Sequence, residues 1–375
     1  MADGPALPEI ALAPGGTALL VRCAGGAVLP IHPLWLRERC RDAGSLDART
    51  EQRLYNPSDL DPGIAIANIA HTGAGVFSIT FSDGRTACFT AAEIHGELPD
   101  APCDIVPAPV PWSVRQPPPP PVDWRRCAEP DIQCAALHAF LLHGYIILNH
   151  VPPNEGTVLQ VARCFGVPRE TNFGVLFDVR SVPDANDLAY TSLPLDPHTD
   201  NPYRAPVPGI QLLHCLTNRT PGGLSTLVDG LAVANALRAE APAMLAILAT
   251  TQVRFRYTDA ETELVASAPL IELHADGSFS AIHYSPRLDF VPLLPPHTLQ
   301  TFYDARRRLD RMLKSDPFER RFRLDDGDLM MFDNRRLLHG RTGFDPSTGL
   351  RHLQGCYIDS DGPRSRYRVL RRRFA

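Results

Sequence analysis

Two side chains that can bind a metal stand one residue apart, at His198 and Asp200. Alternate side chains of an extended segment point to the same side, so this imidazole and this carboxylate can act on one ion. A second histidine would complete the 2-His-1-carboxylate set that holds iron(II) and leaves positions open. A strand is predicted over 208–217, shortly after the first pair. His339 follows an apolar run at 329–334, which predicts a second strand able to return beside it. The spacing therefore predicts a metal site formed by His198, Asp200 and His339.

A histidine followed two residues later by an acid is a weak signal by itself. With 13 histidines and 42 acidic residues in 375 positions, about 1.5 such pairs are expected by chance, and the sequence has three. The pair at 274–276 runs directly into Gly277, which favours a hairpin turn. The pair at 95–97 has no second histidine placed to complete a set. These two pairs are better explained without a metal.

An arginine follows the second histidine at a useful distance. Arg351 lies twelve residues after His339 and opens the apolar run 351–358, which predicts another strand. A 2-oxo dicarboxylate bound at iron needs a partner for its far carboxylate, and a guanidinium binds a carboxylate through two parallel hydrogen bonds. Two further histidines remain as alternative ligands. They are His214, inside a predicted strand, and His352, whose side chain should point away from that of Arg351.

The predicted elements of the second part of the chain position these residues. Apolar runs typical of buried strands occupy 145–151, 208–217, 224–230, 329–334 and 351–358. Helical periodicity covers 131–144, 154–166, 230–248 with an interruption at Pro242, and 297–315. Strands on both sides of helices, with little strict alternation, favour an α+β, mainly β domain built on a mostly antiparallel sheet.

The first part of the chain has a different character. The segments 18–36 and 74–90 each hold two β-type runs around a glycine-containing turn, and they predict a small β-rich domain over 1–106. Eight prolines crowd the short stretch 107–121, a composition that favours polyproline II over a packed element. We therefore expect a proline-rich connector over 107–122 and the catalytic domain over 123–375.

Composition narrows the class of protein. The net charge of −5 argues against nucleic acid as a partner. No apolar run reaches the roughly 18 residues that a transmembrane helix needs, and the start lacks the basic segment of a secretory signal. We expect a cytoplasmic protein with no membrane partner, whose nine cysteines are reduced thiols. The arginines between 364 and 373 are expected to be solvated side chains of a packed terminal segment.

Five segments resemble the γ-butyrobetaine and trimethyllysine hydroxylase branch of the TauD/TfdA-type iron(II)/2-oxoglutarate dioxygenases. These segments are 34–56, 198–216, 222–230, 332–341 and 351–373. The resemblance implies a double-stranded β-helix (jelly roll) with flanking helices, a homodimer, and iron(II) held by His198, Asp200 and His339. It also implies that Arg351, with Ser225 as a second contact, binds the cosubstrate 2-oxoglutarate. With O₂, such an enzyme hydroxylates a C–H bond and releases succinate and CO₂.

One feature of that branch is missing. Its N-terminal domain often holds a zinc with a cysteine cluster and a later histidine. Only Cys40 matches a ligand here, because the other positions hold Asp42, Ser45 and Arg85. One ligand of four cannot form a closed tetrahedral site, so we predict no structural zinc.

The branch also encloses a trimethylammonium group in a cage of aromatic rings, which attract the cation through their π faces. The matching positions are all aromatic in this sequence. They are Phe173, Phe177, Tyr190 and Tyr357. The resemblance therefore implies that a quaternary ammonium group is bound.

The positions that would hold the substrate's anion are changed. Asp187 and Asn201 occupy two of them, and a third falls near Ser285. An acid at 187 would repel a carboxylate, whereas Arg287 offers a stronger anion contact beside Asn201 and Tyr203, unless it pairs with the acid two residues on. This pattern predicts 2-(trimethylamino)ethylphosphonate, hydroxylated next to phosphorus, as the substrate. The alternative is γ-butyrobetaine, giving carnitine, or another betaine.

Two functions from other classes stay open. A zinc hydrolase using His198, His339 and a third ligand would be inactive with iron and indifferent to 2-oxoglutarate, and it would leave Arg351 without a role. A non-catalytic binder of quaternary ammonium would keep the aromatic cage. Replacing His339 with Ala would leave ligand affinity intact in a binder and abolish oxygen consumption in an enzyme.

Overall fold

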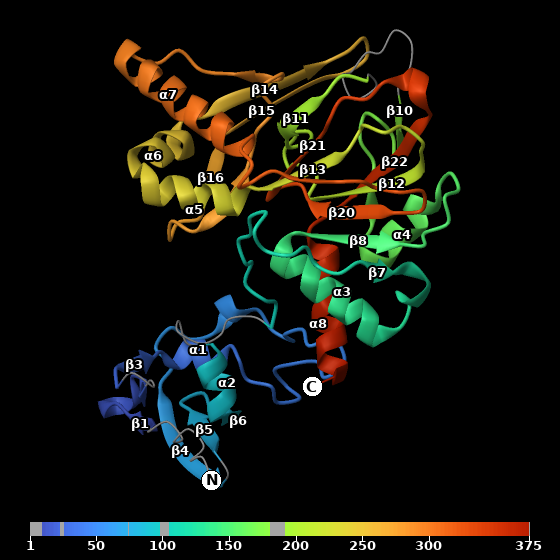
Figure 1. Cartoon of the computed structure of the whole chain (residues 1–375). Helices are drawn as coiled ribbons and strands as arrows, with labels where there is room; N and C mark the ends of the chain where they lie inside the picture. Colours follow the sequence, from blue (N-terminus) through green and yellow to red (C-terminus); the bar gives the residue numbers. More distant parts are fainter. Residues whose placement is uncertain (1–9, 23–25, 74, 98–104, 181–191, 375) are drawn as a thin grey trace. The chain divides into compact units, whose positions relative to one another are not determined.

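A computed structural model describes residues 10–22, 26–73, 75–97, 105–180 and 192–374. The chain divides into two compact units, Met1–Asp104 and Ile105–Ala375 (Figure 1). Each unit has its own buried apolar cluster. All residues that line the cavity described below belong to the second unit.

The first unit is built on two antiparallel sheets and two short helices. One sheet has the order β1-β2-β3 and the other β4-β5-β6. Its elements are β1 (Ile10–Leu12), β2 (Leu19–Arg22), β3 (Val28–Ile31), α1 (Pro33–Arg37), β4 (Ile66–Gly73), β5 (Val76–Phe81), β6 (Thr86–Thr90) and α2 (Ala91–Gly96). Between β5 and β6 the chain turns at Gly84, whose φ of +79° explains why this turn contains a glycine.

The two largest β-sheets of the second unit share an apolar core. The larger sheet has the order β10-β22-β12-β20-β8-β7, with β9 beside β22, and the smaller has the order β11-β21-β13-β19. Side chains of both sheets meet in one buried cluster, where Leu213 and Phe332 of the larger sheet join Leu227 and Leu337 of the smaller. This arrangement is the double-stranded β-helix that the resemblance implied.

Five strands of these sheets match the apolar runs of the sequence at 145–151, 208–217, 224–230, 329–334 and 351–358. The strands of the larger sheet are β7 (Val122–Asp123), β8 (Tyr145–Asn149), β9 (Pro168–Arg169), β10 (Phe177–Arg180), β12 (Ile210–Asn218), β20 (Leu329–Asp333) and β22 (Arg351–Ile358). Those of the smaller sheet are β11 (Leu195–His198), β13 (Ser225–Asp229), β19 (Arg320–Phe322) and β21 (Leu337–Arg341). Pairing is antiparallel except between β7 and β8.

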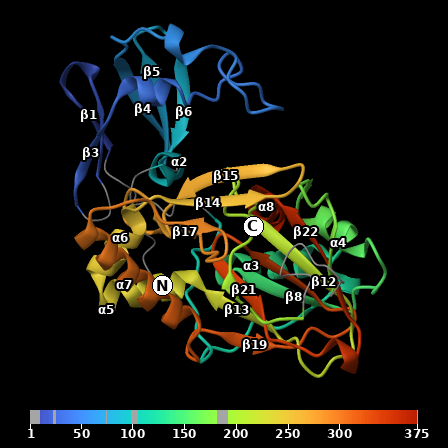
Figure 2. The ribbon, with the colours of Figure 1, turned by 90° about the horizontal axis from the view of Figure 1, so that it is seen from above.

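Helices flank the sheets in two groups (Figures 1 and 2). One group covers the larger sheet and consists of α3 (Pro130–His143), α4 (Thr157–Phe165) and α8 (Asp361–Phe374). The other consists of α5 (Gly230–Glu240), α6 (Pro242–Thr250) and α7 (Pro296–Leu313), which share a second core. The arginine-rich end is α8, which buries Tyr367 and Leu370. No helix in the described ranges is both long and apolar enough to cross a bilayer.

Short strands accompany the second group of helices. They are β14 (Val253–Thr258), β15 (Glu263–Ala268), β16 (Ile271–Leu273), β17 (Phe279–Ile282) and β18 (Asp289–Phe290). The histidine–acid pair at 274–276 lies in the turn between β16 and β17, where Asp276 accepts a hydrogen bond of 2.8 Å from the Ser278 amide. The prediction of a hairpin turn there is confirmed.

The proline-rich segment packs on the second unit. The indole of Trp112 is buried and donates to the His143 carbonyl at 2.7 Å. The Trp112 amide donates to Asp229, which also forms a buried ion pair of 2.8 Å with Arg336. Arg336 in turn donates to the Val110 carbonyl at 2.7 Å. Although its composition suggests a free spacer, this part of the segment is fixed to the jelly roll.

Candidate active site

The three predicted metal ligands come together on the smaller sheet. His198 ends β11 and is the direct register partner of His339 in β21. The Nε2 atom of His198 lies 3.5 Å from Oδ1 of Asp200, and that of His339 lies 3.8 Å from Oδ2. One ligand atom from each residue falls within 4.8 Å of the others, and both imidazoles are buried. Among the described residues, this is the grouping of histidines and acids that could hold a metal ion.

Electrostatics favour a cation at this point. Burial lowers the pKa of His339 to about 3, so its imidazole is neutral, as a metal ligand must be. Desolvation opposes the ionisation of Asp200, but His339, His198 and a hydrogen bond from Tyr357 hold its pKa below the usual range. Two imidazoles and a carboxylate form the donor set that iron(II) takes in the facial triad, so these residues fit the metal.

Partners behind the ligands fix their orientation. Nδ1 of His198 lies 2.9 Å from the Asp196 carbonyl, which leaves Nε2 to face the site. The buried side chain of Asn334 accepts from the Asp200 amide at 2.8 Å and donates to the Asp200 carbonyl at 3.0 Å. Asn201, next in the chain, has a φ of +54°, a left-handed conformation that asparagine tolerates. Asp200 therefore sits in a tight bend that Asn334 clamps.

Arg351 is buried in the same cavity wall. Its Nε donates to the Gly223 carbonyl at 3.2 Å, and a Cβ at Gly223 would lie 2.9 Å from the Arg351 side chain. Burial lowers the pKa of Arg351 to about 10. Within the described ranges no carboxylate forms an ion pair with this guanidinium. A buried guanidinium without a carboxylate partner favours the binding of an anionic ligand.

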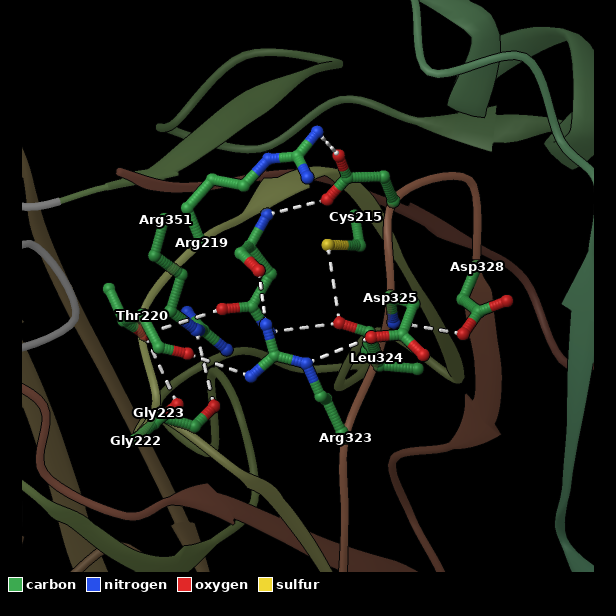
Figure 3. A network of polar contacts seen from close by, with 12 residues as sticks. Cys215, Arg219, Thr220, Gly222, Gly223, Arg323, Leu324, Asp325, Asp328 and Arg351 are labelled. Atoms are coloured by element: carbon green, nitrogen blue, oxygen red, sulfur yellow. Dashed lines mark hydrogen bonds and ion pairs between the residues drawn. The ribbon is translucent and has the colours of Figure 1, made fainter. Parts of the chain in front are cut away.

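A polar network supports the turn against Arg351 (Figure 3). Arg323 donates to the carbonyls of Asn218 and Thr220 and pairs with Asp325 at 2.8 Å. The side-chain Nδ2 of Asn218 donates to the Leu324 carbonyl at 2.9 Å. These contacts tie the end of β12 to the loop before β20. The turn that carries Gly223 is therefore held in place before any ligand binds.

A second buried arginine lies beside the first. Arg341, two residues after His339 on β21, is the register partner of Ser225 in β13. Its guanidinium donates to the Leu193 carbonyl at 2.8 Å. Burial, together with repulsion from Arg351, lowers the pKa of Arg341 to about 10. With Ser225, the two arginines form an electropositive wall in the cavity that contains the metal ligands.

Aromatic side chains line another part of this cavity. Phe177 and Tyr357 have ring centroids 5.2 Å apart, and Phe173 lies on the same cavity. The Tyr357 hydroxyl donates to Oδ2 of Asp200 at 2.7 Å, while burial and that carboxylate raise the pKa of Tyr357 well above its usual value. Tyr190, the remaining predicted cage residue, lies outside the described residues. The structure thus places three of the four predicted rings on the cavity that the metal ligands line.

The predicted anion contacts are also on this cavity. Asn201, Tyr203, Ser285 and Arg287 all line it, whereas Asp187 lies outside the described residues. The Tyr203 hydroxyl donates to Asn201 Oδ1 at 2.5 Å, and the buried Nδ2 of Asn201 has no protein partner. In that orientation the Nδ2 donor of Asn201, a residue that lines the cavity, is left unused. Asp289, the acid two residues after Arg287, forms a 2.9 Å ion pair with Arg306.

The alternative histidine ligands have other surroundings, and neither lines the cavity. His352 Nε2 lies 2.6 Å from Asp178, on the opposite face of β22 from Arg351. His214 is fully buried between the strands of the larger sheet, and burial lowers its pKa to about 4.

The region that matches the family's zinc position is closed by other contacts. Cys40 is buried, and burial raises the pKa of its thiol to about 11, so the thiolate that zinc requires is disfavoured. Asp42 pairs with Arg85 at 3.3 Å, and Ser45 accepts from Arg37 at 3.3 Å. The absence of a zinc stays a prediction.

Sequence reasoning missed several residues of the site. Arg341 could have been found, because it follows His339 by two positions and strand alternation places it on the same face. Gln211, a polar residue in the apolar run of β12, lines the cavity, and its Oε1 is buried without a protein partner. Tyr257 of β14 packs against Phe173 at 5.6 Å and Tyr203 at 5.1 Å. No sequence signal connects Tyr257 with the site.

Comparisons with known proteins give matches to one family, to curated relatives and to a solved structure. A family model described as "Taurine catabolism dioxygenase TauD, TfdA family" matches residues 114–357. The chain is 35% identical over 370 residues to a gamma-butyrobetaine dioxygenase of Pseudomonas sp. (strain AK-1), covering 97% of each protein. It is 27% identical over 357 residues to the mitochondrial trimethyllysine dioxygenase of Mus musculus, covering 92% of this chain and 84% of that protein. A solved non-heme iron oxygenase in complex with Fe and alpha-ketoglutaric acid has a TM-score of 0.48 and 18% identity, covering 63% of this chain and 81% of that one.

Proposed function

The chain belongs to the TauD, TfdA family of dioxygenases, and we propose that it uses iron(II) and 2-oxoglutarate to hydroxylate a small trimethylammonium zwitterion. One observation carries this proposal. A single cavity is lined by the three metal-ligand candidates, by two buried arginines and by aromatic rings. Each set has the chemistry for one reactant: the metal, an anionic cosubstrate and a quaternary ammonium group.

The residues divide the work of this reaction. His198, Asp200 and His339 would hold iron(II), and Arg351 with Ser225 would hold the far carboxylate of 2-oxoglutarate. Bound iron supplies the oxidative chemistry, in which one atom of O₂ enters a substrate C–H bond as hydroxyl and the other enters succinate, with release of CO₂. The protein's part is to place one C–H bond over the metal and to exclude water from the cavity.

The cation end of the substrate would rest on aromatic faces. Phe173, Phe177 and Tyr357 line the cavity and offer π faces to a trimethylammonium group, which has no hydrogen to donate. Tyr190 is proposed as a fourth wall. Such a cation is recognised by its shape and by π faces alone. The aromatic cage therefore selects for the trimethylammonium group and does not distinguish between a carboxylate and a phosphonate at the other end of the substrate.

The anion end favours 2-(trimethylamino)ethylphosphonate, hydroxylated next to phosphorus. Arg287 lines the cavity with the buried Ser285 and with the Nδ2 donor of Asn201. A phosphonate offers three oxygens and up to two negative charges, so it suits several donors better than a carboxylate does. Against this, the identity to a gamma-butyrobetaine dioxygenase favours γ-butyrobetaine as the second candidate.

A substrate panel tests the proposal. Phosphonate and γ-butyrobetaine are each bound without oxygen to the protein loaded with iron(II) and 2-oxoglutarate, then oxygen is admitted and succinate and product mass are measured. We expect succinate and a product one oxygen heavier with the phosphonate. Turnover of γ-butyrobetaine but not of the phosphonate would overturn the choice of anion, and turnover of no quaternary ammonium compound would overturn the substrate class.

Two variants test the proposed anion contact and the proposed metal ligand separately. Replacing Arg287 with Gln should weaken phosphonate binding about 5-fold and leave tetramethylammonium binding unchanged, because only the anion meets the guanidinium. Replacing His339 with Ala should abolish succinate release. If the zinc-loaded protein hydrolysed a substrate without 2-oxoglutarate, and the iron-loaded protein released no succinate, the hydrolase alternative would be correct. Light scattering tests the homodimer that the family resemblance implies.

A further inference from the structure

Tyr357 belongs to two parts of the site at once. Its ring lies 5.2 Å from that of Phe177 and lines the cavity, where it forms one wall of the proposed cage. Its hydroxyl, at the other end of the same side chain, donates to Oδ2 of Asp200 at 2.7 Å. The side chain is only 3% exposed. One residue therefore joins the aromatic wall to the carboxylate of the metal-ligand set.

The position of this side chain is fixed by the larger sheet. Tyr357 pairs with Gln211 of β12 on one side and with Arg169 of β9 on the other. A residue held between two strands cannot shift along the sheet without breaking the ladder. Asp200, by contrast, follows β11 of the smaller sheet in a bend. The phenol of Tyr357 thus connects a strand of the larger sheet to the metal ligand that follows β11 of the smaller sheet.

The hydrogen bond from Tyr357 restrains the Asp200 carboxylate, which the contacts with Asn334 do not hold. Asn334 holds the amide and the carbonyl of Asp200, and so restrains its main chain. The carboxylate can still rotate about its side-chain bonds. The phenol bonds Oδ2, while Oδ1 lies 3.5 Å from Nε2 of His198. A partner of this kind behind a ligand sets the ligand's orientation and contributes to metal affinity.

We propose that Tyr357 is the positioning residue for the Asp200 carboxylate, in addition to the place of its ring in the proposed cage. The first role depends only on the hydrogen bond. The second rests on the proposed function, because it needs a quaternary ammonium ligand. Bound cation and bound metal are then aligned by one rigid side chain.

Three single substitutions separate the roles. Tyr357→Phe keeps the ring and removes the hydroxyl, whereas Phe177→Leu removes the neighbouring ring and keeps the hydroxyl. Tyr367→Phe is the matched control, because its buried phenol lies 2.9 Å from His138 on the far helices and touches no metal ligand. Each metal-free protein is titrated with Co²⁺. Each Co²⁺- and 2-oxoglutarate-loaded protein is then titrated with tetramethylammonium.

We expect Tyr357→Phe to bind Co²⁺ about 10-fold more weakly than the wild type and tetramethylammonium within twofold of it. Phe177→Leu should show the reverse, with unchanged Co²⁺ affinity and about 5-fold weaker tetramethylammonium binding. Tyr367→Phe should change neither. A Co²⁺ affinity of Tyr357→Phe within twofold of the wild type, or an equal loss in Tyr367→Phe, would overturn the positioning role.

The two proposals can fail independently. If the wild type binds Co²⁺ but not tetramethylammonium, the trimethylammonium substrate class and the cage role of Tyr357 are both wrong. The Co²⁺ titrations of Tyr357→Phe and Tyr367→Phe would still decide whether the phenol positions Asp200. If the wild type binds tetramethylammonium and Tyr357→Phe loses it together with Phe177→Leu, the hydroxyl and the ring do not act separately, and the division of roles is overturned.

Discussion

Removing the side chain of Asn334 should damage both stability and metal binding, because this one amide shapes the bend that carries Asp200. Asn334 is fully buried. It accepts from the Asp200 amide at 2.8 Å and donates to the carbonyls of Asp200 at 3.0 Å and Pro208 at 3.1 Å. Asn334→Ala deletes all three hydrogen bonds without changing a ligand.

The magnitude follows from these contacts. A buried hydrogen bond contributes about 0.5–1.5 kcal/mol net, so losing three should lower the free energy of unfolding by about 2–4 kcal/mol. The loss of an outer partner of a ligand lowers metal affinity by about 10–100-fold. We expect about 10-fold for Asn334→Ala, since the Tyr357 hydroxyl still holds the Asp200 carboxylate.

The assay needs a control that loses stability elsewhere. Gln133 of α3 is buried and makes two side-chain hydrogen bonds, with the Cys164 carbonyl at 3.2 Å and with Arg366 at 2.9 Å. Gln133→Ala should cost about 1–3 kcal/mol and leave Co²⁺ affinity unchanged. Urea unfolding of the metal-free proteins and Co²⁺ titrations supply both quantities. Co²⁺ affinity of Asn334→Ala within twofold of the wild type would refute the clamp, whatever its stability.

Two further predictions concern buried charges. Arg351→Lys keeps the charge but loses the bidentate geometry, so the affinity of the metal-loaded protein for 2-oxoglutarate should fall about 10-fold. Arg351→Met also loses the charge, and its affinity should fall about 100-fold. Equal affinities in the wild type and both variants would contradict the role of Arg351 in binding 2-oxoglutarate. His214 has a pKa of about 4 in the folded chain because of burial, against 6.5 when exposed. As pH falls from 6.5 to 4 the unfolded chain takes up this proton and the folded chain does not, which should cost about 3 kcal/mol of stability. Urea unfolding at several pH values should show a smaller loss in His214→Asn over that range, and identical losses would show that His214 does not titrate in this way.

Local patterns predicted five strands of the second unit and the helices α3 to α7. The apolar runs at 145–151, 208–217 and 329–334 are strands β8, β12 and β20. The helical period interrupted at Pro242 is a pair of helices, because proline starts a helix readily but cannot continue one. These elements are readable because side-chain periodicity follows directly from burial of one face. The order of the strands in the sheets is not readable in this way, since the register partners β12 and β22 lie far apart in the chain.

The proline-rich segment shows where composition misleads. Its residues disfavour helices and sheets, and this much is correct, since no regular element covers most of it. Its attachment depends on Trp112 and on the buried pair of Asp229 with Arg336, two residues that lie more than a hundred positions apart. A contact of that separation leaves no periodic trace in the sequence. The segment therefore reads as a spacer although the fold binds it.

In the site, too, some residues could be predicted from the sequence and others could not. A metal ligand is limited to a few residue types, so His198, Asp200 and His339 stand out from chance once an arginine follows at a fitting distance. The residues that hold Asp200 have no such restriction, because Asn334 and Tyr357 act through ordinary hydrogen bonds that many side chains could make. Their roles exist only when two sheets bring them within 3 Å of the bend. The metal ligands can therefore be predicted from the sequence, whereas the residues that orient these ligands can be identified only from the fold.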